Sequence, residues 1–130
     1  MSCEQNKQVA RDFFGALGRR ESEAMNALMH DDLQWWVIGE DGFGGTKDKA
    51  ELNAAIGALW DMMEGDCTID FVQMTAEDDR VAIIGQGEMA TKGGVPYRNT
   101  YNFLLTIRDA KVFRGREYFD TKMVDRVFGF

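Results

Sequence analysis

Residues 97–120 read YRNTYNFLLTIRDAKVFRGREYFD, two runs of alternating side chains joined by the short link Asp109-Ala110. Successive side chains of a β-strand point to opposite faces, so this alternation predicts two half-buried strands, Tyr97–Arg108 and Lys111–Thr121. Because the link is so short, the two strands must pair antiparallel. The segment therefore predicts an antiparallel sheet with one apolar face.

Polar side chains share that apolar face in both strands. In the first strand, Asn99 lies on the same face as Tyr97, Tyr101, Phe103, Leu105 and Ile107. In the second, one face carries Phe113, Gly115, Glu117 and Phe119, and the other carries Val112, Arg114, Arg116 and Tyr118. If the phenylalanines point inward, Glu117 does too.

A carboxylate taken out of water costs several kcal/mol unless it is paired, neutralised or hydrated in a cavity. Two interpretations of Glu117 follow. In the first, it is an acid/base in a pocket, where a raised pKa suits proton transfer near neutral pH. In the second, it forms an ion pair with an arginine on a neighbouring strand or a partner subunit.

For the preceding predicted strand, Arg80–Thr91, the alternation does not decide which face points inward. One face carries Gln86 and Glu88 with Ala82, Ile84 and Ala90, and the other carries Val81, Ile83, Gly85, Gly87 and Met89. If the first face points inward, Gln86 and Glu88 join Glu117 in one cavity. If the Val81 face is buried, both polar residues are exposed.

The rest of the chain predicts helices before the sheet. Apolar spacing predicts helices over Glu4–Leu17 and Ser22–Met29, and a third helix capped by Thr46 and ended by Gly65. Strands are expected at Leu33–Ile38 and Thr68–Thr75 in addition to the three above. The order α-α-β-α-β-β-β-β is typical of an α+β domain, and 130 residues fit a single one, 1–130.

Composition narrows the classes of partner. The net charge of −7 and the lack of a Lys/Arg stripe argue against nucleic acid and anionic membranes. The N-terminus does not resemble a signal peptide and no run approaches a membrane span, so we expect a soluble cytoplasmic protein. Neither Cys3 nor Cys67 has metal-ligand spacing, and nucleotide and zinc motifs are lacking, so we expect no cofactor and no metal.

The aromatic, Asn-bearing strand from Tyr97 to Phe103 and the closing REYFD segment, Arg116–Asp120, resemble the NTF2-like superfamily, in its SnoaL-like and ketosteroid-isomerase-like branch. The resemblance covers nearly the whole chain. It implies a cone-shaped barrel, in which a curved antiparallel sheet packs against three N-terminal helices, with an apolar pocket at the wide end and frequent dimerisation through the sheet. Members include isomerases, polyketide cyclases, limonene-type epoxide hydrolases, dehydratases and non-catalytic binding proteins.

In the epoxide hydrolases and cyclases of this superfamily, a pocket acid lies on the last strand, and Glu117 matches that position. Two features depart from the pattern. Ketosteroid isomerases have a base after the first strand, near where Val37 stands here. Epoxide hydrolases need an arginine between two acids, and none appears around Gln86 and Glu88.

The leading expectation is therefore an enzyme that moves a proton on a small apolar carbonyl or cyclic compound, as an isomerase, cyclase or dehydratase. Glu117 would be the acid/base, while Asn99, Tyr101 and Gln86 would orient the substrate or bond a developing oxyanion. Trp36, Trp60 and Phe119 would line the pocket, although aromatic residues at the spacings of Trp36 and Trp60 are more often part of a simple core. The alternatives are epoxide hydrolysis by Glu117 with Glu88, and a non-enzymatic ligand-binding or interaction module.

Two further expectations concern surfaces. Leu104, Val112 and Tyr118 on the outer face predict a partly apolar sheet surface that a second copy covers, giving a homodimer. The apolar C-terminal segment, Met123–Phe130, packs over the pocket mouth, onto a partner, or on its own core.

Overall fold

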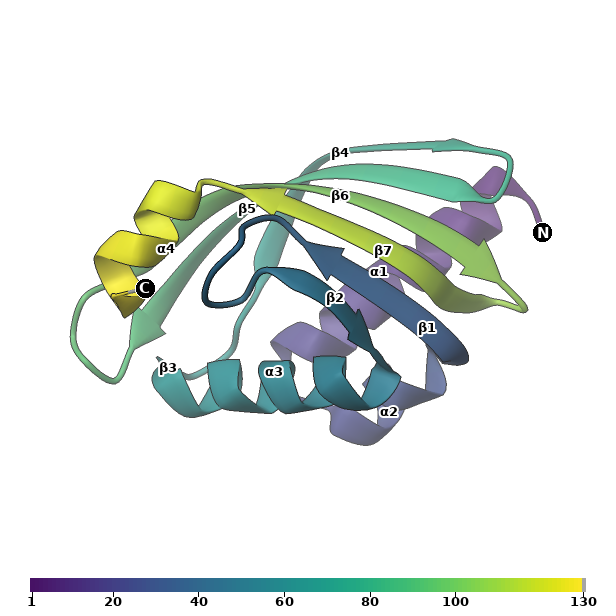
Figure 1. The fold of residues 1–130 in the computed structure, drawn as a ribbon. Helices are drawn as coiled ribbons and strands as arrows, with labels where there is room; N and C mark the ends of the chain where they lie inside the picture. Colours follow the sequence, from purple (N-terminus) through teal and green to yellow (C-terminus); the bar gives the residue numbers. More distant parts are fainter. Residues whose placement is uncertain (130) are drawn as a thin grey trace.

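The computed structural model describes residues 1–129 as an α+β domain, which confirms the predicted fold class. A strongly curved sheet carries α1, α2 and α3 on its concave side, and α4 lies at one end of the sheet (Figure 1). The helices are α1 Cys3–Gly18, α2 Ser22–Ala27, α3 Lys49–Met62 and α4 Thr121–Phe128. The strands are β1 Met29–Val37, β2 Gly45–Asp48, β3 Met63–Glu64, β4 Ile69–Glu77, β5 Arg80–Thr91, β6 Tyr97–Arg108 and β7 Lys111–Phe119.

The sheet order is β2-β1-β7-β6-β5, and β5 also pairs with both β4 and β3. The pairs are antiparallel except for β1 and β7, which run parallel. The expected meander β4-β5-β6-β7 is confirmed, while β2, β3 and α4 are additional elements. No helix within residues 1–129 is long and apolar enough to cross a bilayer.

The third helix begins later than the sequence pattern predicted. Asp48, and not Thr46, caps it: the Asp48 side chain accepts the Glu51 backbone N–H at 2.8 Å, and the Glu51 side chain accepts the Asp48 N–H at 3.1 Å. This reciprocal capping box satisfies two backbone donors at once. It frees Thr46 and Lys47 to form β2, which pairs with β1.

The open question about β5 is settled in favour of the Val81 face. Val81, Ile83 and Met89 are buried, and Gln86 and Glu88 are exposed. Glycine explains the choice, because a Cβ at Gly85 would lie 2.6 Å from a methyl group of Ile69. The buried face thus combines large apolar side chains with glycines that let neighbouring side chains approach the backbone.

A bulge in the β6–β7 pairing overturns part of the predicted alternation in β7. The register shifts between Thr106 and Ile107, so Val112 is fully buried and Phe113 turns outward. The Phe113 ring lies between two arginines, with the guanidinium carbons of Arg108 and Arg114 at 3.9 and 3.8 Å from its centroid. Val112 therefore cannot belong to an outer dimer surface.

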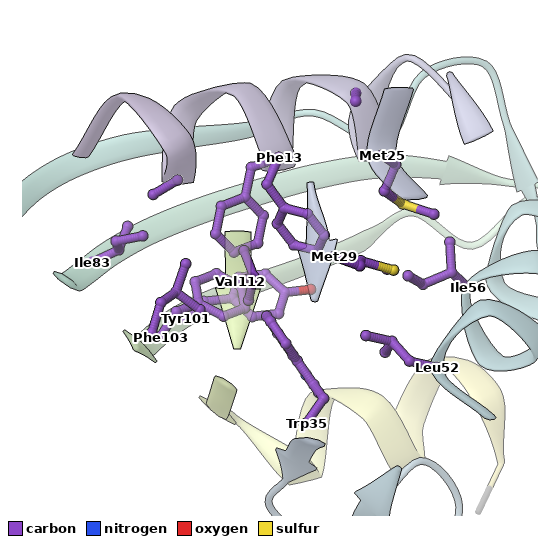
Figure 2. Close-up of a cluster of buried hydrophobic side chains, with 14 of the residues drawn as sticks. Phe13, Met25, Met29, Trp35, Leu52, Ile56, Ile83, Tyr101, Phe103 and Val112 are labelled. Carbon is purple, nitrogen blue, oxygen red and sulfur yellow. The ribbon is translucent and has the colours of Figure 1, made fainter. Parts of the chain in front are cut away.

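Aromatic side chains from α1 and the sheet form the centre of the core (Figure 2). The Phe14 ring lies 4.6 Å from Phe103, and Phe103 stacks on Tyr101 at 5.3 Å. Trp35 joins them from β1, 5.9 Å from Phe13. This packed cluster forms one wall of the space in which the candidate site lies.

Candidate functional site

Glu117 lies on the concave face of β7, between Val37 of β1 and Phe103 of β6. It borders two small cavities of about 90 and about 80 Å³. Since one water needs only ~10–15 Å³ by this measure, each cavity is several times larger than a water site. The two cavities share Glu117 and Tyr101 with three apolar residues of α3, which are Leu52, Ile56 and Leu59.

Trp35 holds the carboxyl group of Glu117. Its indole Nε1–H donates to Glu117 Oε1 at 2.9 Å. The ring reaches Glu117 by crossing over Gly115, its register partner on β7, where a Cβ would lie only 2.2 Å from the indole. Gly115 is thus the position that allows Trp35 to contact the acid.

Burial in these apolar surroundings raises the pKa of Glu117 above its ordinary value of 4.5, while the Trp35 N–H and the charge of Lys47 act in the opposite direction. A carboxyl group whose neutral and ionised forms are brought closer in energy is suited to giving and taking protons. The expected inward position of Glu117 is confirmed. Of the alternative ion pairs, the one with an arginine on a neighbouring strand is wrong, because no arginine within residues 1–129 lies within 4.0 Å of the carboxylate. An ion pair with an arginine of a partner subunit stays a prediction.

Lys47 on β2 is the only cationic side chain of the described residues that line the two cavities. Its Nζ donates to the backbone carbonyl of Phe43. Burial lowers the pKa of Lys47, and the charges of Glu117 and Glu51 raise it. The sequence pattern did not reveal this residue, because β2 is only four residues long and shows no periodicity.

Two tyrosines of β6 form the other polar part of the first cavity. The Tyr101 hydroxyl donates to the Tyr97 hydroxyl at 3.0 Å, and the Asn99 amide donates to the same oxygen at 2.9 Å. Burial raises the pKa of both tyrosines. The Tyr97 oxygen is the acceptor in both bonds. Its own O–H has no acceptor among residues 1–129, so this phenolic proton can be donated to a ligand.

Asn99 supports this pair without lining either cavity. Its side-chain oxygen accepts the backbone N–H groups of Thr100 and Asp120, both at 2.9 Å, and its amide also donates to the Asp120 carbonyl at 3.0 Å. Asp120 in turn caps α4. Asn99 therefore fixes the junction of β7 and α4 and orients Tyr97, and any effect on a ligand must pass through Tyr97.

Gln86 and Glu88 are not near Glu117, so the expectation that they complete its cavity is wrong. They border an open polar groove on the outer face together with Asp70, Arg98 and Asp120. Glu88 forms an exposed ion pair with Arg98 at 3.1 Å. The burial of the Val81 face directs both side chains outward.

The two predicted pocket tryptophans also lie elsewhere. Trp36 points away from the cavities and packs against Tyr118, with ring centroids 5.2 Å apart, and the Arg116 guanidinium lies over its ring. Trp60 donates its indole N–H to the Leu17 carbonyl at 3.2 Å, which joins α3 to α1. The tryptophan at the site is Trp35, one residue from the one predicted.

The C-terminal segment has two of its three expected roles, because it borders the first cavity through Phe128 and packs on the core of its own chain through Val124. Phe128 of α4 lines the cavity with Phe119, and its ring packs 5.1 Å from Tyr97 and 5.5 Å from Phe43. The predicted segment extended to Phe130, which lies outside the described residues. Tyr101 and Phe119, by contrast, line the cavity as expected.

No cluster of three His, Cys, Asp or Glu side chains in residues 1–129 is placed to hold a metal ion. The polar groups at the cavity are instead one carboxyl, one ammonium and two phenols, all attached to strands of the sheet. Such a set can bind an oxygen atom of a small molecule and move a proton.

Comparison with known proteins agrees with this fold. Residues 10–115 match the SnoaL-like domain family. The chain is similar to an NTF2-like protein from Burkholderia xenovorans LB400, with 30% identity over 97% of both chains and a TM-score of 0.80. No curated protein matches the sequence.

Two more distant solved structures share the fold. TerC, co-crystallised with polyporic acid, is 22% identical over 97% of this chain and 99% of its own, with a TM-score of 0.83. PrhC from Penicillium brasilianum is 17% identical over 98% of this chain and 87% of its own, with a TM-score of 0.87. The chain belongs to the SnoaL-like domain family of the NTF2-like superfamily.

Proposed function

We propose that this protein binds a small, largely apolar carbonyl or cyclic compound and transfers a proton on it, with Glu117 as the acid/base. The observation that carries the proposal is the position of Glu117, an ionisable carboxyl group in an apolar cavity without an ion-pair partner within 4.0 Å among residues 1–129. Isomerisation, cyclisation and dehydration all include such a step.

The proposed step uses groups that line one cavity. The Glu117 carboxylate takes a proton from the carbon next to the carbonyl, and the electron pair moves to the carbonyl oxygen. The free phenolic proton of the Tyr97–Tyr101 pair hydrogen-bonds that oxygen and stabilises the enolate. Glu117 then returns the proton to the same or another carbon of the ligand, and the carboxylate is restored.

Proton exchange on a simple ketone tests this proposal, whatever the natural substrate is. Cyclohexanone in D₂O incorporates deuterium next to its carbonyl each time a proton is removed, and NMR measures the rate. We expect the protein to accelerate the exchange and Glu117→Gln to slow it by about 10²–10⁴-fold. Because the base must be ionised, the rate should rise with pH through the raised pKa of Glu117.

Glu88→Gln is the matched control, since Glu88 is a sheet glutamate on the outer face. The Glu88→Gln variant should catalyse deuterium exchange on cyclohexanone as fast as the unaltered protein. Equal rates for the unaltered protein and Glu117→Gln would reject the acid/base role. If the ligand still binds, that result favours the non-enzymatic binding module. Epoxide hydrolysis by two carboxylates is not proposed, because Glu88 lies outside the cavity.

We also propose that the protein forms a homodimer through the outer face of the sheet. Leu104 and Ile84 are 37% and 41% exposed on adjacent strands, and Tyr118 lies on the same face. A partner that covers these side chains removes apolar surface from water. Analytical ultracentrifugation at micromolar concentration should give the mass of a dimer, and the mass of a monomer would contradict this.

A further inference from the structure

Lys47 is placed in the cavity with most of its hydrogen-bonding capacity unused. An ammonium group has three donors. One of them bonds the Phe43 carbonyl, and the structure gives the Lys47 side chain no other hydrogen bond within residues 1–129. The Lys47 side chain is half-buried and lines the cavity, so its remaining donors are accessible to a ligand that enters there.

The two carboxylates whose charges act on Lys47 form no ion pair with it. Glu117 and Glu51 are both near enough to influence it. Neither carboxylate lies within the 4.0 Å of an ion pair, and Glu51 is instead bound to the Asp48 N–H at the start of α3. Lys47 and Glu117 thus line the same cavity with a space between them.

The order of strands places these groups in a row across the concave face. Lys47 is on β2, Glu117 on β7, and Tyr101 on β6, with β1 between the first two. Tyr97 lies beside Tyr101 in the cavity wall. The remaining lining side chains are apolar: Val37, Phe43, Leu52, Ala55, Ile56, Leu59, Phe119 and Phe128. A ligand that fills this space meets a cation at one end and a phenol at the other.

We propose that the ligand of this cavity carries an anionic oxygen, most simply a carboxylate, which Lys47 binds. The anion would take the unused donors of Lys47 and form with it the close ion pair that Glu117 and Glu51 do not form. This inference rests on the proposed function, because it names the class of molecule on which Glu117 acts. The carboxylate would hold the molecule at β2 while its apolar body lies against α3.

Benzoate and benzamide provide the test, since they have nearly the same shape and differ in charge. Calorimetry or ligand-observed NMR should give benzoate an affinity at least about tenfold higher. Lys47→Met keeps much of the apolar stem and should abolish the preference, whereas Lys47→Arg should retain it. Lys92→Met removes an exposed lysine in the turn after β5 and should leave the preference unchanged.

Equal affinities of the unaltered protein for the two compounds, including failure to bind either, would overturn the proposal. Retention of the preference in Lys47→Met would overturn it too. The outcome is separable from that of the exchange experiment. Glu117→Gln should keep the preference for benzoate, so a failure of proton exchange would leave carboxylate binding intact.

Discussion

Glu88 and Glu117 are both glutamates of the central sheet, yet they lie in opposite environments. Glu88 is on the outer face, where its side chain is 67% exposed and pairs with an Arg98 side chain that is 66% exposed. Exposed pairs of this kind contribute little to stability because water screens them. Glu117 lies on the inner face, where burial raises its pKa. The face on which a strand presents a carboxyl group, rather than the residue type, determines what chemistry it can perform.

The largest expected effect on stability comes from displacing Trp35, which holds Glu117, while Glu117 itself is left unchanged. In Gly115→Ala, the new Cβ would lie 2.2 Å from the Trp35 indole, so the ring must move away from Glu117. Overpacking of a rigid ring should lower the free energy of unfolding by about 3 kcal/mol. Urea denaturation measures this change.

Gly57→Ala in α3 is the matched control. A Cβ at Gly57 has no heavy atom within 4 Å, and alanine is the better helix former. This variant should be more stable by about 0.5–1 kcal/mol. If Gly115→Ala were as well tolerated as Gly57→Ala, the close contact between Trp35 and β7 would be refuted.

A smaller effect is expected when only the hydrogen bond to Glu117 is removed. Trp35→Phe keeps an aromatic ring but loses the indole N–H, so the free energy of unfolding should fall by about 1–2 kcal/mol. The pKa of Glu117 should rise further, because the Trp35 N–H stabilises the ionised form.

Trp36→Phe is the comparison for this variant, since Trp36 lies on the outer face against Tyr118. It should leave the pKa of Glu117 unchanged when both variants are titrated by NMR. Identical titration of Glu117 in the two variants would contradict the assigned role of Trp35.

Much of the fold follows from period-two alternation in the sequence. The inner face of β6 was predicted correctly from Tyr97 to Ile107. The pairing of β6 with β5 has no bulge from Tyr97 to Thr106, so the alternation is kept along the strand. The alternation failed in β7, where the bulge reverses the sides of Val112 and Phe113. A bulge is a property of the pairing between strands, so the sequence of one strand does not reveal it.

The candidate site was predictable only in part, for reasons that differ among its residues. Glu117 and Tyr101 stand out because a polar group interrupts an apolar face. Trp35 was missed because two adjacent tryptophans make both faces of β1 look aromatic, and only the glycine opposite decides between them. Lys47 was missed because its place on β2 depends on where α3 begins. Both Thr46 and Asp48 are acceptable caps in the sequence, and the capping box between Asp48 and Glu51 selects the later start.

The pKa of the Glu117 carboxyl group is the most direct test of the proposed chemistry. NMR of side-chain carboxyl carbons over a pH titration measures it, and Glu117→Gln assigns the resonance by removing it. We predict a pKa above the ordinary value of 4.5, because burial outweighs the Trp35 hydrogen bond and the charge of Lys47. A value at or below 4.5 would show that Glu117 is held as a structural carboxylate, and would contradict its role as the acid/base.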